Sequence, residues 1–560
     1  MTSTPVRAGL ALSLTLVAPG VGAQSPLFED ATRELGIDFS HRHFGTGRKY
    51  MPENMGAGLA VFDVDGDGQL DVYLVQASGA LPGSTGDTEA TNRLFRQGAD
   101  GRFQDVTEGS GVGHGGYGMG ASFGDIDGDG DLDLFVTNYG PDALFRNDGE
   151  CRFTEVAAGS ELARDVWSSS AGMLDADNDG DLDLFVARYL DWHPANHKFC
   201  GNAQTGLRSY CHPDVYEGAP DGLFLNDGTG RFARTVDRAG IRTSANDKGL
   251  GLVLSDLNAD GIQDIYVAND STRNYLYLGS GKGTFREDAL AAGVAVNARG
   301  AREASMGVEL GDLNGDGLPD LFLTHLDEET NTLYMSSGVG LWVDRTEATG
   351  LAEPSRPWVG FGTVLGDFDH DGDEDLFVAN GHIIDNIDRF DGTRRHRQPP
   401  QLFLNDGSGR FVERRDLLGV EGDLAGRAAL GADIDDDGDL DLLITQNDGP
   451  TLVLRNLSST ATAGLRVSLA GSNSNPQGYG ARIELAADGL TQRRWLKSAS
   501  SYLSQGPPEV HFALRAETAV LTVYWPSGAI SKRPDIRAGH HYTVAEDGAS
   551  PPSRPFAKSQ

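Results

Sequence analysis

The sequence predicts an all-β protein in which a seven-bladed β-propeller is followed by a small C-terminal β-sandwich. Three observations predict this fold: an acidic nine-residue phrase that recurs seven times, a hairpin-like phrase between its copies, and alternating segments over residues 464–547. Glycine supplies 75 of the 560 residues, about twice its usual share, as in chains with many turns. Repeats at this spacing are typical of propellers.

The acidic phrase reads DVDGDGQLD at its first copy, from Asp63, and DIDDDGDLD at its last, from Asp433. The sixth position is always Gly, and the tail after each copy is rich in Val, Ile, Leu and Phe, which predicts a buried strand. Position one holds Asp63, Asp125, Asp175, Asp256, Asp312, Asp367 and Asp433. Position three holds Asp65, Asp127, Asp177, Asn258, Asn314, Asp369 and Asp435. Position five holds Asp67, Asp129, Asp179, Asp260, Asp316, Asp371 and Asp437. Position seven holds Gln69, Asp131, Asp181, Ile262, Leu318, Asp373 and Asp439. Position nine holds Asp71, Asp133, Asp183, Asp264, Asp320, Asp375 and Asp441.

Oxygen ligands at alternate positions of a tight loop are suited to a hard cation, and Ca²⁺ takes six to eight oxygens in flexible geometry. We expect side-chain oxygens from positions one, three, five and nine, and the backbone carbonyl from position seven, whose side chains share no chemistry. An EF-hand places an acidic ligand at position twelve and continues as a helix, whereas position twelve here is apolar in every copy. The loops therefore predict up to seven structural Ca²⁺ ions.

A hairpin phrase, such as NRLFRQGADGRFQDVT from Asn92, follows the acidic loops. Strand, loop, strand and hairpin give four strands a unit, as in a propeller blade. The last hairpin, Thr451–Asn456, lacks its second half, and Leu27–Leu35 resembles that half, so we expect an N-terminal strand to complete the last blade. Small residues such as Gly56 and Gly58 precede each acidic loop, as crowded inner strands would require.

These phrases resemble FG-GAP/VCBS repeats, the blades of integrin α-like propellers, over residues 24–460. The resemblance implies Ca²⁺ ligation by the acidic positions, on one face of the disc. The C-terminal segments Gly478–Arg482, Ser501–Gln505, His511–Phe512 and Trp525–Gly528 look like the ASPIC/UnbV module, which accompanies such propellers in proteins similar to the cartilage acidic protein family. The predicted ASPIC/UnbV-like domain spans residues 464–547, and a disordered tail is expected over residues 548–560.

The first residues resemble a secretory signal, with Arg7 before an apolar stretch and Val21-Gly22-Ala23 as the cleavage site. We predict a signal peptide over residues 1–23, cleaved near Ala23, and a secreted or periplasmic protein; a membrane anchor is the alternative. Cys200 and Cys211 are close enough in sequence to form a disulfide in an exported chain, which leaves Cys151 odd. Reduced, packed thiols are the other interpretation of this pair.

The net charge of −36 argues against nucleic acid and anionic membranes as partners. Two inserts, Tyr189–Asp221 and Gly381–Pro400, and basic residues in the loops that lead into the inner strands should lie on the face opposite the metal loops. Those basic residues are Lys49, Arg164, Lys248, Arg299, Arg302, Arg356 and Arg427. They suggest a basic channel mouth that receives a protein, a glycan or a small anionic ligand; cations that merely solvate this face are the alternative.

No catalytic motif is present: the sequence has no G-x-S-x-G elbow, HExxH, Walker loop or dinucleotide fingerprint. We therefore assign no catalytic residue and no organic cofactor. Two functions remain. The first is an exported calcium-binding propeller that binds ligands through the loops opposite the Ca²⁺ sites. The alternative is an enzyme with its active site at the channel mouth, acting on a small anionic or polar substrate.

Overall fold

The computed structural model describes residues 25–78, 81–84, 90–244, 246–420, 422–458 and 464–557. The predicted signal peptide, residues 1–23, lies outside the described residues. The chain is all-β, and no helix in its described part exceeds four residues. Within the same ranges, no helix has the length and apolar character needed to cross a lipid bilayer.

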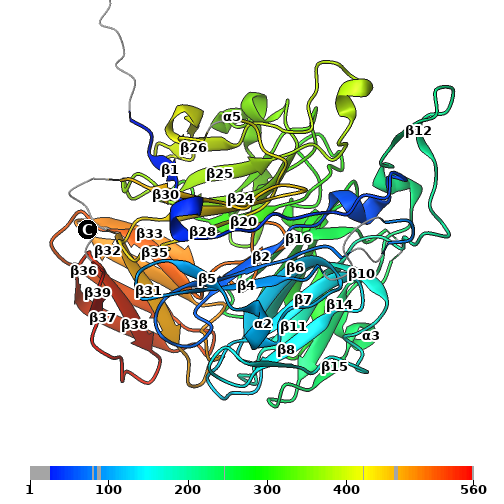
Figure 1. The fold of residues 1–560 in the computed structure, drawn as a ribbon. Helices are drawn as coiled ribbons and strands as arrows, with labels where there is room; N and C mark the ends of the chain where they lie inside the picture. Colours follow the sequence, from blue (N-terminus) through cyan, green and yellow to red (C-terminus); the bar gives the residue numbers. More distant parts are fainter. Residues whose placement is uncertain are drawn as a thin grey trace, which may run out of the picture.

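Most strands fall into units of four strands, numbered 1 to 7 here, in which neighbouring strands pair antiparallel (Figure 1). Units 2 and 3 also pair with each other and so form one eight-stranded sheet. Unit 1 contains β2 (Leu59–Phe62), β3 (Asp71–Leu74), β4 (Arg93–Gln97) and β5 (Phe103–Asp105), and unit 2 contains β6 (Tyr117–Gly124), β7 (Asp133–Gly140), β8 (Ala143–Asn147) and β9 (Phe153–Glu155). Unit 3 contains β10 (Val166–Leu174), β11 (Asp183–Arg188), β14 (Gly222–Asn226) and β15 (Phe232–Arg234), and unit 4 contains β16 (Gly249–Ser255), β17 (Asp264–Asn269), β18 (Tyr275–Gly279) and β19 (Phe285–Glu287). Unit 5 contains β20 (Val308–Gly311), β21 (Asp320–Leu323), β22 (Thr332–Gly338) and β23 (Leu341–Asp344), and unit 6 contains β24 (Gly360–Gly366), β25 (Asp375–Asn380), β26 (Gln401–Asn405) and β27 (Phe411–Glu413). Unit 7 contains β28 (Gly426–Ala432), β29 (Asp441–Gln446), β30 (Leu452–Asn456) and β1 (Phe28–Asp30).

The N-terminal strand β1 completes unit 7, as the sequence predicts. Phe28 pairs with Asn456 and Asp30 with Leu454. The first strands of the units neighbour one another in chain order, and β28 of unit 7 neighbours β2 of unit 1. Buried side chains fill the space between neighbouring units; Phe62 of unit 1, for example, stacks on Phe123 of unit 2 with ring centroids 4.6 Å apart. The series of units therefore closes on itself.

Short helices follow the fourth strands of several units and fix how closely the next unit approaches. They are α1 (Thr32–Leu35), α2 (Thr107–Ser110), α3 (Val236–Ala239), α4 (Ala289–Ala292) and α5 (Thr346–Thr349). Each ends in a glycine with a left-handed backbone; Gly111, at φ 85°, would bring a Cβ within 2.6 Å of the Phe153 carbonyl oxygen of the next unit. Only glycine meets both demands. The remaining short helices are α6 (Ala352–Ser355), η1 (Met51–Asn54), η2 (Pro213–Val215), η3 (Ile387–Arg389) and η4 (Arg415–Leu417).

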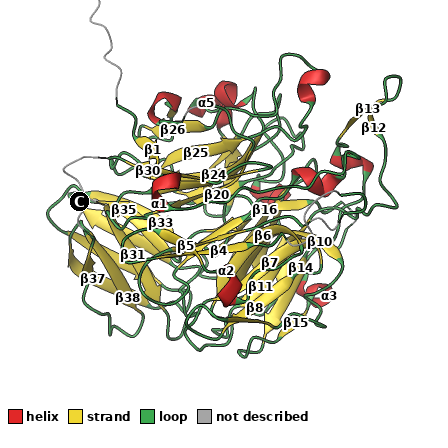
Figure 2. Cartoon of the chain, viewed as in Figure 1, coloured by secondary structure: helices red, strands yellow, loops and turns green. Residues whose placement is uncertain are grey.

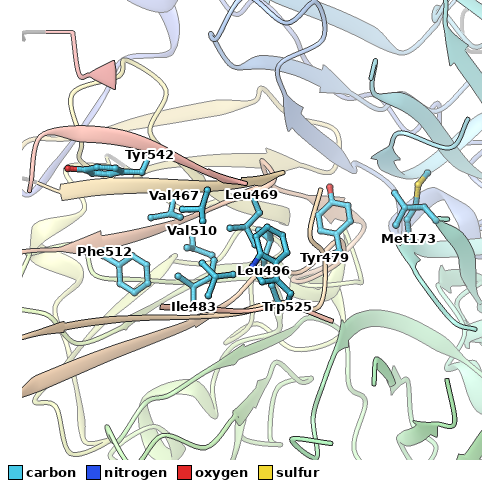
Figure 3. Close-up of a cluster of buried hydrophobic side chains, with 14 of the residues drawn as sticks. Met173, Val467, Leu469, Tyr479, Ile483, Leu496, Val510, Phe512, Trp525 and Tyr542 are labelled. Carbon is cyan, nitrogen blue, oxygen red and sulfur yellow. The ribbon is translucent and has the colours of Figure 1, made fainter. Parts of the chain in front are cut away.

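The C-terminal region forms two further four-stranded sheets, which lie at one side of the units in Figure 1. One sheet contains β35 (Glu509–Ala513), β31 (Gly464–Ala470), β38 (His540–Ala545) and β39 (Arg554–Pro555). The other contains β33 (Leu490–Trp495), β32 (Arg482–Ala487), β36 (Ala519–Tyr524) and β37 (Ile530–Ile536). Their buried side chains share one cluster with units 2 and 3, and Figure 3 shows Met173 of β10 on the side of this cluster nearest Tyr479.

The tail differs from the predicted disorder. Residues 548–557 are described, and β39 pairs with β38, with Pro555 opposite His540. The Arg554 guanidinium also donates to Asp436 Oδ2 at 2.8 Å, in the acidic loop of unit 7. These contacts order the tail although its composition, with three prolines, suggested otherwise.

An arm projects from the body within the insert Tyr189–Asp221 (Figure 2). It is a hairpin of β12 (Cys200–Asn202) and β13 (Leu207–Ser209). A disulfide joins Cys200 and Cys211 at the base of the arm, and Cys151 is free. The disulfide interpretation of this pair is thus confirmed.

The centre of the ring is filled by a segment of the C-terminal region, Ser498–Gln505, which we name the central segment. Its strand β34 (Ser504–Gln505) pairs in parallel with β2 of unit 1. The Ser501 backbone exchanges hydrogen bonds with Val308 of unit 5, at 2.7 and 3.0 Å. Through its hydroxyl, Ser501 donates to the Ala429 carbonyl of unit 7 at 2.8 Å and accepts from the Thr363 N–H of unit 6 at 3.0 Å.

The central segment also bonds to units 2 and 3. The Gln505 side chain accepts from the Phe123 N–H at 2.9 Å and donates to the Phe123 carbonyl at 3.0 Å. Ser170 of unit 3 accepts a hydrogen bond from the Leu503 N–H at 3.1 Å. These contacts refine the explanation of the small inner-strand residues: a Cβ on Gly58 would lie 2.4 Å from the carbonyl oxygens of Leu503 and Met119. The residues of the inner strands are small because these strands pack against the central segment as well as against one another.

Candidate metal sites

The seven acidic loops join the first and second strands of the units, and their backbone is the same in each. Every position-six glycine has a left-handed backbone, with φ between 84° at Gly261 and 104° at Gly372. Position four is left-handed as well, although it is glycine in only three loops; in the others it is Asn178, Ala259, His370 and Asp436. The constant glycine at position six thus has a conformational cause. The second left-handed position was missed because its residues vary.

The position-one carboxylate closes each loop on itself. In the first loop, Asp63 Oδ1 accepts from the N–H groups of Gly66 and Asp67 at 2.9 and 3.1 Å, and Oδ2 accepts from Gly68 at 2.8 Å. The last loop repeats the pattern, because Asp433 accepts from Asp437 and Gly438, both at 3.0 Å. Such side-chain to backbone bonds are typical of Asp in tight turns.

The position-nine carboxylate has a second role, which the sequence did not indicate. Asp183 Oδ2 accepts from the Ala176 N–H of its own loop, and Oδ1 accepts from the Asn226 N–H of β14, both at 2.8 Å. The same two bonds occur at position nine in the other loops, for example from Val64 and Gln97 to Asp71 at 2.9 and 2.8 Å. Position nine therefore ties the loop to the third strand of its unit.

Three carboxylates converge in five of the loops within the described residues, with one oxygen of each within 4.8 Å of the others. In loops 1, 2, 3 and 7 the group consists of positions one, three and nine; in loop 6 it is Asp367, Asp369 and Asp371. Position five joins the group only in loop 6. Its Oδ1 accepts from the position-seven N–H, in loop 6 as well, as Asp67 does from Gln69 at 2.9 Å and Asp371 from Asp373 at 3.0 Å. The sequence-predicted ligands are thus brought together in part.

The position-three carboxylates leave buried oxygens without a partner. In loops 1, 2, 3 and 7 these are Asp65 Oδ1, Asp127 Oδ1, Asp177 Oδ1 and Asp435 Oδ1. Loops 4 and 5 differ, because their amides bond internally: Asn258 and Asn314 each donate to the position-five carboxylate at 3.0 Å. A buried acceptor is costly unless it is bonded or ligates a metal. The donor set of loops 1, 2, 3 and 7 consists only of oxygens and fits a hard cation such as Ca²⁺.

Burial makes the anionic form of these carboxylates unfavourable. Desolvation, against two lowering backbone hydrogen bonds, raises the pKa of Asp71 and of Asp133 to about 7 and that of Asp183 to about 8. Neighbouring loop carboxylates raise these pKa values further. A bound cation reverses both effects, because it favours the charged form of its ligands.

Arginines already contact several loop carboxylates. Arg96 of β4 donates to Asp65 and, at 2.8 Å, to Asp67. Arginines of the C-terminal region do the same; for example, Arg466 Nε lies 3.3 Å from Asp433 Oδ2, and Arg493 Nη1 lies 3.3 Å from Asp312 Oδ2. The C-terminal sheets therefore lie against the metal-loop side, and this side is not a free surface at units 5 and 7.

The opposite side differs from the predicted basic mouth. Arg427 is fully buried, donates to the carbonyls of Asn54 at 2.9 Å and Gly426 at 2.7 Å, and stacks over the Phe361 ring. Lys248 is paired with Asp214 at 3.0 Å. Salt bridges also hold other predicted cations, namely Lys49–Asp385, Arg164–Glu161, Arg299–Glu347 and Arg356–Glu353. These ion pairs neutralise much of the predicted basic mouth, and the sequence alone does not show them.

Two substitutions in loop 3 separate the structural carboxylate from the ligand carboxylate. Asp183→Asn replaces an acceptor by an NH₂ group that faces a backbone N–H, so we expect a loss of about 2–3 kcal/mol in the free energy of unfolding in EGTA. The loss should be larger with calcium, because Asp183 also belongs to the carboxylate cluster of loop 3. Asp177→Asn should destabilise only when calcium is present, because Asp177 Oδ1 has no protein partner. Urea unfolding of both variants, each with calcium and in EGTA, measures the difference. Equal behaviour of the two variants would contradict the assignment.

Comparison with family models identifies the same repeats and the C-terminal domain. The FG-GAP-like repeat model matches residues 63–136, 125–186, 256–323 and 312–378. Each match runs from position one of one acidic loop to position twelve of the next. The ASPIC and UnbV model matches residues 471–551. The chain therefore contains FG-GAP-like repeats and an ASPIC and UnbV domain.

Among curated proteins, the chain is similar to cartilage acidic protein 1. It is 26% identical to the mouse protein over 348 residues, which are 60% of this chain and 51% of the relative, and 26% identical to the human protein over 345 residues, which are 60% and 49%. The chain thus spans about half the length of the curated relatives it matches. The expected resemblance to the cartilage acidic protein family is confirmed.

Solved structures with similar folds are more distant. One is an Agrocybe aegerita lectin described with specific recognition of non-reducing terminal N-acetylglucosamine, at 15% identity and a TM-score of 0.41, covering 64% of this chain and 79% of that one. Another is a rhamnogalacturonan lyase of Bacillus licheniformis, at 12% identity and a TM-score of 0.38, covering 78% and 76%. Neither likeness bears on the function of this chain.

Proposed function

We propose that the protein is an exported, calcium-stabilised seven-bladed β-propeller that binds a partner through the loops opposite its metal sites. Seven closed four-stranded units, each with an acidic loop in the same place, support the propeller. Residues 24–460 form it in this proposal, and residues 464–547 form the ASPIC/UnbV-like domain, which contributes the central segment. Export rests on the signal-like sequence that ends at Ala23 and agrees with the disulfide in the insert.

Calcium is proposed for loops 1, 2, 3, 6 and 7 first, since three carboxylates converge there. The residues that would hold it are positions one, three and nine, or one, three and five in loop 6. Bound Ca²⁺ would supply positive charge to carboxylates that burial leaves unfavourably charged. Its role in this proposal is structural.

The observation that carries a binding role is the position of the two inserts. Asn386 of the insert Gly381–Pro400 donates to the Arg208 carbonyl of the arm at 3.0 Å, so the two inserts meet on one side. Loops held on a rigid scaffold are the usual place of recognition. The alternative, an enzyme at the channel mouth, has less support, because Tyr502 and Leu503 of the central segment are fully buried where a central pocket would be.

Shortening the arm tests this proposal. Deletion of the whole insert Tyr189–Asp221 would remove Tyr189 and Trp192 from a buried cluster and confuse binding with folding. The better variant replaces Asn202–Leu207 by Asn-Gly, which closes a two-residue hairpin between Gly201 and Arg208 and keeps the disulfide. We expect an unchanged melting temperature and loss of most of the partners that the intact protein retains, measured by mass spectrometry after affinity capture. Identical retained partners would contradict the proposal.

A further inference from the structure

The two inserts and the N-terminal loop border an open groove of about 600 Å³ on the side opposite the metal loops. Its charged lining consists of Lys49, Arg208 and Arg389, and its polar lining includes Thr205 and Asn386. These residues come from three segments that are far apart in the sequence. In the sequence, the two inserts stand out by their length and the N-terminal loop by its lysine. The fold brings the three segments together.

A hydrogen bond, an ion pair and a disulfide hold the three segments in place, so the groove is preformed. Asn386 joins the body to the arm through the Arg208 carbonyl, and Lys49 Nζ contacts Asp385 Oδ1 at 2.7 Å. The disulfide at the base of the arm fixes where the hairpin begins. A preformed site spares a ligand the cost of ordering the loops.

The groove is positive in a strongly negative protein. Three cations and no carboxylate line it, whereas the whole chain carries −36. Asp385 offsets Lys49, and the exposed Asp388 lies next to Arg389 in sequence. Within the described ranges, neither Arg208 nor Arg389 forms an ion pair; Arg208 instead stacks over the Phe199 ring, 4.8 Å from its centroid. Two guanidinium groups thus remain available for an anion.

The lining also limits what kind of anion fits. Leu207 is its only apolar side chain, and protein partners usually need a buried apolar or aromatic centre. Long polyphosphates are opposed by the acidic remainder of the surface. Gly47 and Gly206 leave open space where side chains would stand, so the polar backbone is accessible there. The volume falls within the range of about 300–1,000 Å³ that is typical of small-ligand sites.

We propose that this groove binds a short segment of an anionic polysaccharide, whose carboxylate or sulfate groups pair with Arg208 and Arg389. Both groups present coplanar or paired oxygens that a guanidinium binds through two N–H groups. The exposed Thr205 is placed to bond to a sugar hydroxyl. This inference rests on the proposed function and specifies the ligand class of the same side of the molecule.

Binding of defined oligosaccharides to the full-length protein tests the inference. The probes are oligogalacturonate for carboxylates, dextran sulfate oligomers for sulfates, and neutral dextran oligomers, each by titration calorimetry with calcium and in EGTA. The variant Arg208→Gln/Arg389→Gln is compared with Arg152→Gln/Arg286→Gln, which makes the same charge change at exposed arginines paired with Glu150 and Asp288. We expect the groove variant to lose at least about tenfold in affinity for one anionic probe and the control to lose less than about twofold.

Several results would overturn the inference. Equal losses of affinity in the groove variant and the control variant would mean that only the net charge of the protein matters. Equal affinity for the neutral and the anionic oligosaccharides would mean that the anionic groups contribute nothing to binding. Tighter binding of a polyglutamate peptide than of either anionic oligosaccharide would assign the groove to acidic polypeptides. If no oligosaccharide binds but the arm-shortened variant still loses retained partners, the proposed function stands and the polysaccharide is wrong. If no oligosaccharide binds and the arm-shortened variant retains the same partners as the intact protein, the proposed function and the polysaccharide inference are both wrong.

Discussion

Removal of calcium is expected to lower the melting temperature of the protein by about 10 °C or more. A site whose ligand concentration is 100 times its dissociation constant stabilises the folded state by about 2.7 kcal/mol. In large domains each kcal/mol shifts the melting temperature by about 2–4 °C, so two occupied sites suffice. Five three-carboxylate clusters are present among the described residues. The measurement is thermal unfolding with calcium and in excess EGTA.

The control for chelation uses position three. Asp65→Asn, Asp177→Asn and Asp435→Asn, combined in one chain, remove three of the unpartnered buried oxygens but keep the position-nine bonds to the third strands. The combined variant keeps the clusters of loops 2 and 6, so EGTA should lower its melting temperature by clearly less than it lowers that of the wild-type protein. Return of calcium to the chelated wild-type protein should restore its melting temperature. A melting curve that EGTA leaves unchanged would show that calcium has no structural role.

Gly58→Ala is expected to destabilise the protein by about 3 kcal/mol or more. The added Cβ would lie 2.4 Å from the carbonyl oxygens of Leu503 and Met119 and 2.6 Å from the Gly120 Cα. All three are backbone atoms of neighbouring elements, so no side-chain rotation can relieve the overlap. Overpacking of a closed interior by one methyl group costs about 1–3 kcal/mol even where side chains can adjust. The shift in the urea midpoint measures the effect.

Gly109→Ala provides the matched control. Gly109 lies in α2, has no left-handed backbone, and has no atom within 4 Å of the position of an added Cβ. The same methyl group should be neutral or slightly stabilising there. Comparable stability of the two variants would contradict the close contact between the central segment and the inner strands.

The repeated loops could be predicted from the sequence because their requirements are local. The left-handed backbone at position six requires Gly, and the carboxylates at positions one, five and nine are Asp, in every copy. The same locality explains the prediction of β1, since Leu27–Leu35 repeats the form of the other fourth strands. The second role of position nine could not be predicted in this way. Asp is constant there, but its hydrogen bond to the third strand, as from the Asn226 N–H to Asp183, exists only in the folded unit.

Contacts between distant segments left no such pattern. The central segment is Ser-Ala-Ser-Ser-Tyr-Leu-Ser-Gln, and its small polar residues carry no sign of their partners in the ring. The prediction of a basic channel mouth was wrong for a similar reason. The charge of a residue alone does not show that Arg427 is buried or that Lys248 pairs with Asp214. Arg389 and the arm were recognised as parts of inserts, but their meeting through Asn386 required the fold.

The position of the central segment has a consequence for how the chain folds. A ribosome or a translocation channel delivers the N-terminus first, yet the middle of the ring holds residues 498–505, which come near the end of the chain. The inner strands therefore remain without their central partner until about nine-tenths of the chain has emerged, and contacts over such sequence distances form slowly. Late completion exposes the unfinished ring to proteases and to aggregation. A chain cut short before Ser498 should accordingly behave as a folding intermediate rather than as a smaller version of the protein.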